Sequence, residues 1–171
     1  PYGVMNDRPF MRLSASAEHR LKKGNLIWRN RGQYGVMYWP EEPLKSLHHR
    51  FFLGGGPSLR GFAFNKVHPS GYKGQQFDTN IGGDKSLFLS TEIQYAVFPN
   101  YRLLTFLDAG RVYASSEDPI KFNDLFSSTG FGVIIPTMFG DVAFTEAIRL
   151  TKEVDYVNQP PRFMFHCILV R

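Results

Sequence analysis

The sequence is poor in cysteine and has no long hydrophobic run. Cys167 is the only cysteine among 171 residues, which excludes an internal disulfide framework and a multi-cysteine metal site. No stretch approaches the ~18 consecutive apolar residues that a membrane-spanning helix requires. This excludes helical spans only, because a strand of a membrane barrel needs ~9–11 residues with an alternating pattern.

Charge is scattered rather than clustered. The formal net charge is +5, and the only tight basic cluster is RLKKG at 20–24, so a dedicated nucleic-acid surface is not expected. The chain starts with proline and no signal-like apolar segment follows, which predicts a fragment or a processed product.

Aromatic residues, in contrast, make up 15% of the chain, and several segments alternate between apolar and polar side chains. Segments 10–21, 25–39, 86–98 and 102–113 all have a period of two, which predicts long strands with one apolar and one polar face. In 86–98 the apolar face holds Leu87, Leu89, Thr91, Ile93, Tyr95 and Val97, and the other holds Phe88, Ser90, Glu92, Gln94 and Ala96.

Three more strands are predicted at about 130–136, 141–151 and 162–171, giving about seven. Strand length favours a transmembrane barrel, although a soluble β-sandwich also alternates. Aromatic residues gather at strand ends, as in the interfacial girdles of barrels: Tyr38, Trp39, Phe98, Tyr101 and Tyr113. Because a bacterial-type membrane barrel needs at least ~8 strands, we expect an all-β, antiparallel fold in which residues 1–171 form the C-terminal part of a larger transmembrane barrel.

One residue departs from the strand pattern. Glu146 shares a face with Val142, Phe144, Ile148 and Leu150. If that face meets lipid, an ionised carboxylate there is costly unless it lies near an interface.

The longest connection, at about 40–85, contains RFFLGGGPSLRGFAF at 50–64. Gly54, Gly55 and Gly56 would let this loop approach a barrel wall closely, and Pro57 would stiffen the turn. We therefore expect a loop that folds back into the lumen.

Arg60 would be carried into that lumen and must find an acceptor, since an unpaired buried charge costs ~3–5 kcal/mol. Glu92 and Asp108 lie on the polar faces of the strands that follow the loop. Phe106 shares the face of Asp108 and could stack beneath the guanidinium.

The segments FFLGGGPSLRGF, NIGGD, STEIQY and TFLDAG, followed by a C-terminal strand, resemble the outer-membrane β-barrel insertase superfamily. Its members include the bacterial barrel-assembly protein BamA, the mitochondrial sorting-and-assembly barrel and the plastid import barrels. The resemblance covers about residues 8–171 and implies the last seven or so of a barrel's sixteen strands. It assigns the loop tip to Arg60, Gly61 and Phe62, and the wall that this tip meets to Glu92, Phe106, Asp108 and Gly110.

The resemblance implies an insertase without catalytic residues or cofactors, which inserts β-barrel precursors through a lateral seam. Segment 162–171 would be the seam strand, since an edge strand offers unpaired N–H and C=O groups. The side chains concerned are Phe163, Phe165, Ile168 and Val170. The implied partners are unfolded β-barrel precursors, accessory subunits of an assembly complex, the rest of the barrel and the lipid bilayer. The ending LVR, in place of a terminal aromatic residue, favours a mitochondrial outer-membrane protein over a bacterial one.

Other functions are weighed against this one. A polypeptide-translocating pore of the same superfamily shares the arginine loop, and a soluble β-sandwich binding module would use its polar faces as its surface. A phosphate-binding loop is disfavoured because no Gly-Lys-Ser/Thr follows the glycines. His48 and His49 point to opposite faces of an extended segment, so no metal site is expected, and Cys167 is expected to be a packing residue.

Overall fold

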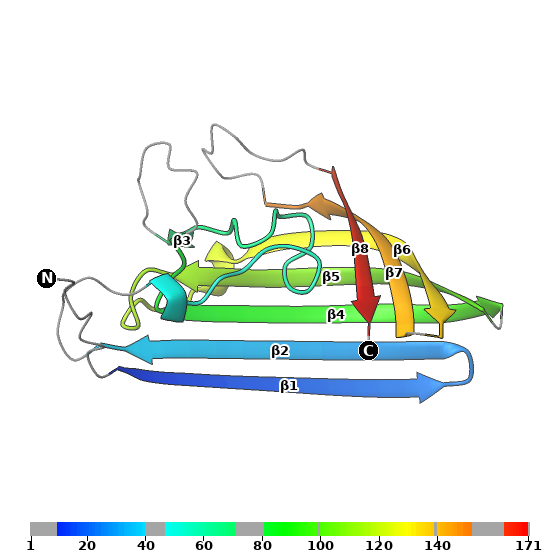
Figure 1. The fold of residues 1–171 in the computed structure, drawn as a ribbon, viewed down its shortest axis with the longest axis horizontal. Coiled ribbons are helices and arrows are strands. Elements are labelled where there is room, and N and C mark those ends of the chain that lie inside the picture. The colour runs from blue at the N-terminus through cyan, green and yellow to red at the C-terminus, as the bar shows by residue number, and fades with distance from the viewer. Residues whose placement is uncertain are drawn as a thin grey trace, which may run out of the picture.

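The long strands form one antiparallel sheet that curls over a central loop (Figure 1). The structure, a computed structural model, describes residues 10–39, 47–70, 81–98, 100–138, 140–151 and 163–170. Within these residues the sheet runs in the order β1-β2-β4-β5-β6-β7-β8, and every neighbouring pair is antiparallel. The long strands are β1 (Met11–Lys23), β2 (Leu26–Tyr38), β4 (Lys85–Phe98), β5 (Tyr101–Tyr113), β6 (Phe126–Thr137), β7 (Gly140–Arg149) and β8 (Phe163–Val170).

Three short elements lie in the connections of the described chain. The strand β3 (Pro69–Ser70) pairs in parallel with the end of β5. Single 3-10 turns occur at Leu47–His49 and Phe122–Asp124. No helix among the described residues is long and apolar enough to cross a membrane.

The predicted all-β antiparallel fold is confirmed, and the two-layer sandwich is wrong, because all the long strands described belong to one sheet. The strand predicted at 130–136 begins earlier, at Phe126, since Ser127, Ser128 and Thr129 carry no apolar pattern but still pair with β5. Residues 40–46 and 71–80 of the long connection, and residues 162 and 171 at the ends of the last predicted strand, lie outside the described residues.

The strands turn their apolar faces outward. On β4 and β5, Leu89, Ile93, Leu103 and Leu107 are exposed, whereas alternate residues such as Phe88, Leu104 and Asp108 are buried on the inner face. This is the reverse of the arrangement in a water-soluble sheet and is the arrangement of a lipid-facing barrel wall. Part of the inner face is covered by the loop between β2 and β4, whose apolar side chains pack against Phe88, Val112 and Phe126.

The connections differ in length between the two ends of the sheet. Two residues separate β1 from β2, β4 from β5 and β6 from β7, all at the end drawn on the right of Figure 1. The strand ends that lead into the three longer connections, between β2 and β4, β5 and β6, and β7 and β8, lie at the opposite ends of these strands. Short turns at one end and long loops at the other are typical of outer-membrane barrels.

Two side chains lie differently from expectation. Tyr38, Phe98 and Tyr101 are exposed near strand ends, but Tyr113 is only 2% exposed and therefore belongs to no girdle. It is buried with Lys85, whose Nζ lies 5.4 Å from the ring centroid. Cys167 is exposed and not a packing residue, because it falls on the outward face of β8 with Phe165.

Candidate functional site

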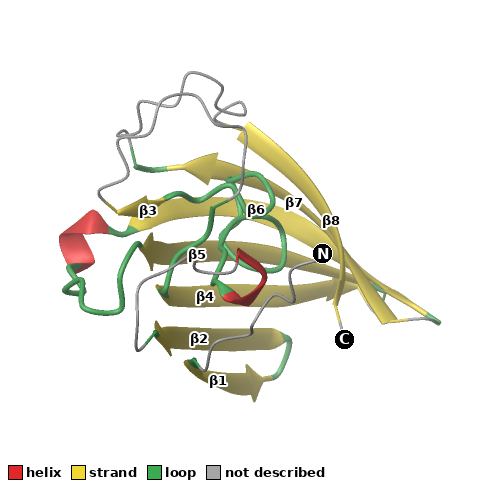
Figure 2. Ribbon diagram, turned by 60° about the vertical axis from the view of Figure 1, so that its left-hand side comes forward, coloured by secondary structure: helices red, strands yellow, loops and turns green. Residues whose placement is uncertain are grey.

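The described part of the loop between β2 and β4, at 47–70 and 81–84, lies on the concave side of the curled sheet (Figures 1 and 2). Its tip is a closed turn held by backbone hydrogen bonds from Gly55 N to Phe62 O at 2.9 Å and from Ser58 N to Gly55 O at 3.1 Å. Ser58 Oγ also donates to Gly54 O at 3.1 Å. These bonds fix the segment that carries Arg60, so the arginine is presented by a folded turn.

The three loop glycines meet two different needs. Gly54 and Gly55 have φ angles of 112° and 94°, in the left-handed region that favours glycine. Gly56 has no such angle, but a Cβ there would lie 2.7 Å from Cγ1 of Ile168 on β8. The first two glycines thus shape the turn, and the third lets it approach β8.

Arg60 forms a bidentate ion pair with Asp108 on β5. Its Nε donates to Oδ2 at 2.7 Å and its Nη2 to Oδ1 at 2.9 Å, while its backbone N–H also points at Oδ2, at 3.3 Å. Arg60 is 5% exposed and Asp108 is fully buried. A planar guanidinium suits this paired geometry, which a lysine cannot reproduce.

Two further wall residues complete the arginine's surroundings. Nη1 of Arg60 donates to Oε2 of Glu92 on β4 at 2.7 Å. The guanidinium carbon lies 3.5 Å from the ring centroid of Phe106, which is a cation–π contact in a site shielded from water. The arginine is therefore held by two carboxylates and one aromatic face.

The charge of Arg60 is secured by these neighbours. Burial disfavours the charged guanidinium, but the hydrogen bonds and negative charges of Asp108 and Glu92 outweigh that effect and raise the pKa of Arg60 above its ordinary value. The side chain is therefore a permanent cation that ties the loop to the wall.

Strand register explains why the wall residues lie together. Ser90 on β4 is opposite Asp108 on β5, and Glu92 is opposite Phe106. Ser90 Oγ donates to Oδ1 of Asp108 at 2.6 Å. On the other side of β5, Phe106 is opposite Gly130, where a Cβ would lie 2.7 Å from the ring's Cζ. The glycine leaves room for the ring on which the guanidinium rests.

The other predicted loop and wall residues lie at the same docking surface. Gly61, with φ 85°, packs close to Ser128 on β6, and its N–H donates to Nε2 of His166 on β8 at 3.2 Å. Phe62 is buried against Phe126, with ring centroids 5.5 Å apart. Gly110 lies beneath Leu53, whose Cδ1 would be 3.2 Å from an added Cβ.

The predicted seam strand is β8, which pairs with β7 and has no partner on its other side among the described residues. Ile168 faces inward against Gly56 of the loop, and Phe165 faces outward with 63% of its surface exposed. Phe163 and Val170 lie in the ladder opposite Ile148 and Asp141.

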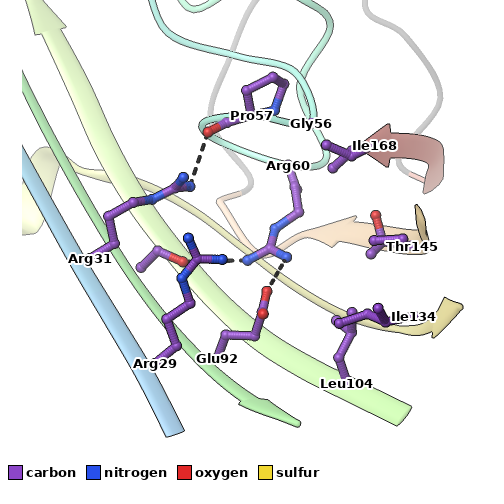
Figure 3. Close-up of a pocket in the computed structure, with 12 residues that line it drawn as sticks. Arg29, Arg31, Gly56, Pro57, Arg60, Glu92, Leu104, Ile134, Thr145 and Ile168 are labelled. Carbon is purple, nitrogen blue, oxygen red and sulfur yellow. Dashed lines mark hydrogen bonds and ion pairs between the residues drawn. The ribbon is translucent and has the colours of Figure 1, made fainter. Parts of the chain in front are cut away.

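A pocket of about 230 Å³ opens beside the loop tip (Figure 3). On its cationic side Arg29 pairs with Glu18 at 2.8 Å and Arg31 donates to the carbonyl of Pro57 at 3.0 Å. The opposite side is formed by the apolar Leu104, Ile134, Ala143 and Ile168, together with the hydroxyl-bearing Thr145. The inner wall therefore changes from cationic to apolar across the loop tip.

Sequence reasoning missed three contacts of this site, those of Ser90, Arg31 and His166. Ser90 shares the polar face with Glu92, so that pattern could have indicated it. Arg31 lies on the charged face of the segment 25–39, but the alternation of that segment does not indicate which atom of the loop it binds. His166 had no local signal, because the curl of the sheet brings it to the loop. Among the described residues no cluster of three or more histidine, cysteine or carboxylate side chains could hold a metal.

Comparisons with known proteins identify the fold and the family. The profile of the Omp85 superfamily domain matches residues 3–167. The structure is similar to that of BamA from Haemophilus ducreyi lacking POTRA domains 1–3, with a TM-score of 0.73 and 20% identity, over 95% of this chain and 35% of that one. The chain thus spans about a third of the BamA chain, and at this identity the likeness concerns the fold alone. No curated protein matches.

Proposed function

Because the chain belongs to the Omp85 superfamily, we propose that it is part of an outer-membrane barrel that assists the folding and insertion of β-barrel precursors. The precursor would pair with the free edge of β8, since an edge strand presents unpaired N–H and C=O groups to an incoming strand. No covalent step is involved, so the function needs no catalytic residue. Its partners would be unfolded precursors, accessory subunits of an assembly complex and the remainder of the barrel.

One observation carries this proposal. The loop tip is bound to the wall through Arg60 and Asp108, and the same tip contacts the inner side of β8 at His166 and Ile168. A docked tip would hold the end of the sheet in the geometry that a precursor strand must meet. Arg60, Gly61 and Phe62 would then be the docking tip, and Glu92, Phe106, Asp108 and Gly110 its receptor on the wall.

A charge exchange tests the docking. Arg60→Glu in the full-length protein should block assembly of a β-barrel client in isolated membranes, because three carboxylates would then face one another. Adding Asp108→Arg should restore part of the assembly by reversing the pair. Arg20→Glu, an inner-face arginine of β1 outside the tip's contacts, is the matched control and should assemble clients normally. Normal assembly by Arg60→Glu would show that the docked tip is not needed.

A polypeptide-translocating pore is the second candidate, and the cationic side of the pocket favours it, since Arg29 and Arg31 line open space on the inner face. Photocrosslinkers at Phe165 and at Arg29 separate the two functions. An insertase should crosslink an arrested client at position 165, whereas a pore should crosslink it at position 29. Mitochondrial location is a separate hypothesis, tested by importing the full-length protein into isolated mitochondria.

A further inference from the structure

Glu146 is a carboxylate on the outward, apolar face of β7. Its neighbours along the strand, Ala147 and Thr145, are buried on the inner side, so Glu146 points the opposite way. Across the ladder it lies between Phe131 of β6 and Phe165 of β8, each 63% exposed. On its own strand the nearest residues of the same face are apolar as well, Phe144 towards the short turn and Ile148 towards the long loops. Glu146 is therefore enclosed by the apolar band and does not lie at its rim.

Other polar groups on this outward face find partners within the sheet. Thr105 Oγ1 donates to Gly130 O at 3.0 Å, and Thr129 Oγ1 donates to Phe106 O at 2.7 Å. On the same outward face, but nearer β1, Trp28 Nε1 of β2 donates to Thr91 Oγ1 of β4 at 2.9 Å. Hydroxyl groups can donate to strand carbonyls, but an ionised carboxylate can only accept.

The carboxylate of Glu146 has no such hydrogen-bond partner within the sheet. Among the described residues it makes no hydrogen bond or ion pair, and the two residues directly opposite it, Phe131 and Phe165, are apolar. Within the described chain its charge acts only on His166, which lies on the inner face of the sheet. An ionisable side chain at such a depth is costly, and it generally marks a function that supplies its partner.

The surroundings of Glu146 match those of a cation site. Inside the barrel wall this chain holds a guanidinium with carboxylates and the face of Phe106. On the outside, Glu146 provides the carboxylate, and Phe131 and Phe165 provide aromatic rings on either side of it. The rings of Phe144 and Phe165 are stacked with centroids 6.1 Å apart, so the aromatic side chains next to Glu146 on this side pack against each other. A cation placed over Glu146 would gain both charge pairing and cation–π attraction.

We propose that the outward face of β6–β8 around Glu146 docks a membrane-spanning segment of another protein, which brings a lysine or arginine to Glu146. Lipid tails offer neither a donor nor a cation, and lipid headgroups lie at the interface, beyond the apolar residues that flank Glu146 along β7. A membrane-spanning protein segment can carry a lysine or arginine to this depth. The contact with Glu146 would neutralise the charge of that basic side chain as well as the charge of Glu146. This inference is independent of the loop tip and of client assembly.

A defined probe tests the proposal. The full-length protein is placed in phosphatidylcholine vesicles with a fluorescent single-span leucine peptide that carries one central lysine, or with the same peptide carrying leucine there. Energy transfer should show about fivefold or greater preference for the lysine peptide. Glu146→Gln and Glu146→Leu should abolish the preference, and Glu146→Asp should retain it. Glu117→Gln, an exposed carboxyl in the connection between β5 and β6, is the matched control and should behave as wild type.

Three results would overturn the proposal. The first is equal binding of the two peptides by the wild-type protein, and the second is an unchanged lysine preference in Glu146→Gln. The third is Glu146-dependent energy transfer between two labelled copies without peptide, which would identify a second copy of this chain as the occupant. Circular dichroism of each vesicle-embedded variant checks that the β-sheet is intact, so that loss of preference is not loss of fold.

Discussion

The backbone N–H of Gly61 donates a hydrogen bond to Nε2 of His166, at 3.2 Å, and so joins the docked loop tip to the last strand of the sheet. The preceding residue, Arg60, is bound to Asp108 on β5, so two successive residues of the tip contact two strands that are not neighbours. A short, rigid turn thus bridges the middle of the sheet and its free edge. Any movement of β8 away from the loop must break this contact.

Removing the acceptor at His166 should loosen the tip without unfolding the sheet. His166→Phe keeps an aromatic side chain but cannot accept the bond, which is worth ~0.5–1.5 kcal/mol. Amide exchange in residues 58–64 should therefore become up to about tenfold faster, measured by hydrogen–deuterium exchange in lipid vesicles. His166→Gln retains an acceptor and should exchange more slowly than His166→Phe. Equal exchange in both variants and in the wild type would show that the bond does not restrain the tip.

The two carboxylates of the site should differ in importance. Asp108 is fully buried and accepts three bonds from Arg60, whereas Glu92 accepts one from it. Asp108→Asn should lower the free energy of unfolding by ~3–5 kcal/mol, because it removes the main counter-charge of a buried cation. Glu92→Gln should cost ~1.5–3 kcal/mol. Urea titrations followed by the fluorescence of Trp28 and Trp39 measure both, and a larger loss in Glu92→Gln would reverse the ranking.

Much of this site follows from the two-residue period of the strands. The pattern of 86–98 and 102–113 assigned Glu92, Phe106 and Asp108 to inner faces, and strand register then places those residues side by side. The sequence predicts which face of a strand is the polar inner one, because the outer face must be apolar over the same length. An arginine that the loop carries into the lumen then has few carboxylates within reach as acceptors.

The contacts of β8 could not be read in the same way. His166 is 105 positions from Gly61, and the two meet only because the curl of the sheet brings β8 to the loop tip. Curl depends on twist summed over several strands, and no local pattern encodes it. Tyr113 was misplaced for a related reason, since its backbone pairs with Ser70 and Asp84 of the connection after β2, and a period of two says nothing about loops.

Alanine at Gly54 should disturb the loop more than alanine at another glycine of positive φ. A Cβ at position 54 would lie 2.3 Å from the carbonyl oxygen of Ala63, so Gly54→Ala adds a collision to the ~1–2 kcal/mol cost of a left-handed residue. Gly24 has φ 59° in the β1–β2 turn, and a Cβ there would meet nothing within 4 Å. Limited proteolysis should cut within 47–70 faster in Gly54→Ala than in Gly24→Ala. Equal cutting would mean that the tight turn at Gly54 does not hold the loop.

Gly130 should be the strand glycine that tolerates a side chain least, because the ring of Phe106 packs directly against it. A Cβ at position 130 would lie 2.0 Å from the carbonyl oxygen of Glu146 and 2.7 Å from Cζ of Phe106. Gly130→Ala must therefore strain the β6–β7 pairing or tilt the ring that contacts the guanidinium of Arg60.

Gly32 on β2 is the matched control, since its Cβ would meet only a methyl group of Leu89, at 3.6 Å. Urea midpoints in vesicles should fall clearly for Gly130→Ala and stay near wild type for Gly32→Ala, because added bulk in open space favours a strand. Faster amide exchange in 58–64 for Gly130→Ala alone would show that the strain reaches the loop tip through Phe106, while unchanged exchange there would confine it to the strand pair.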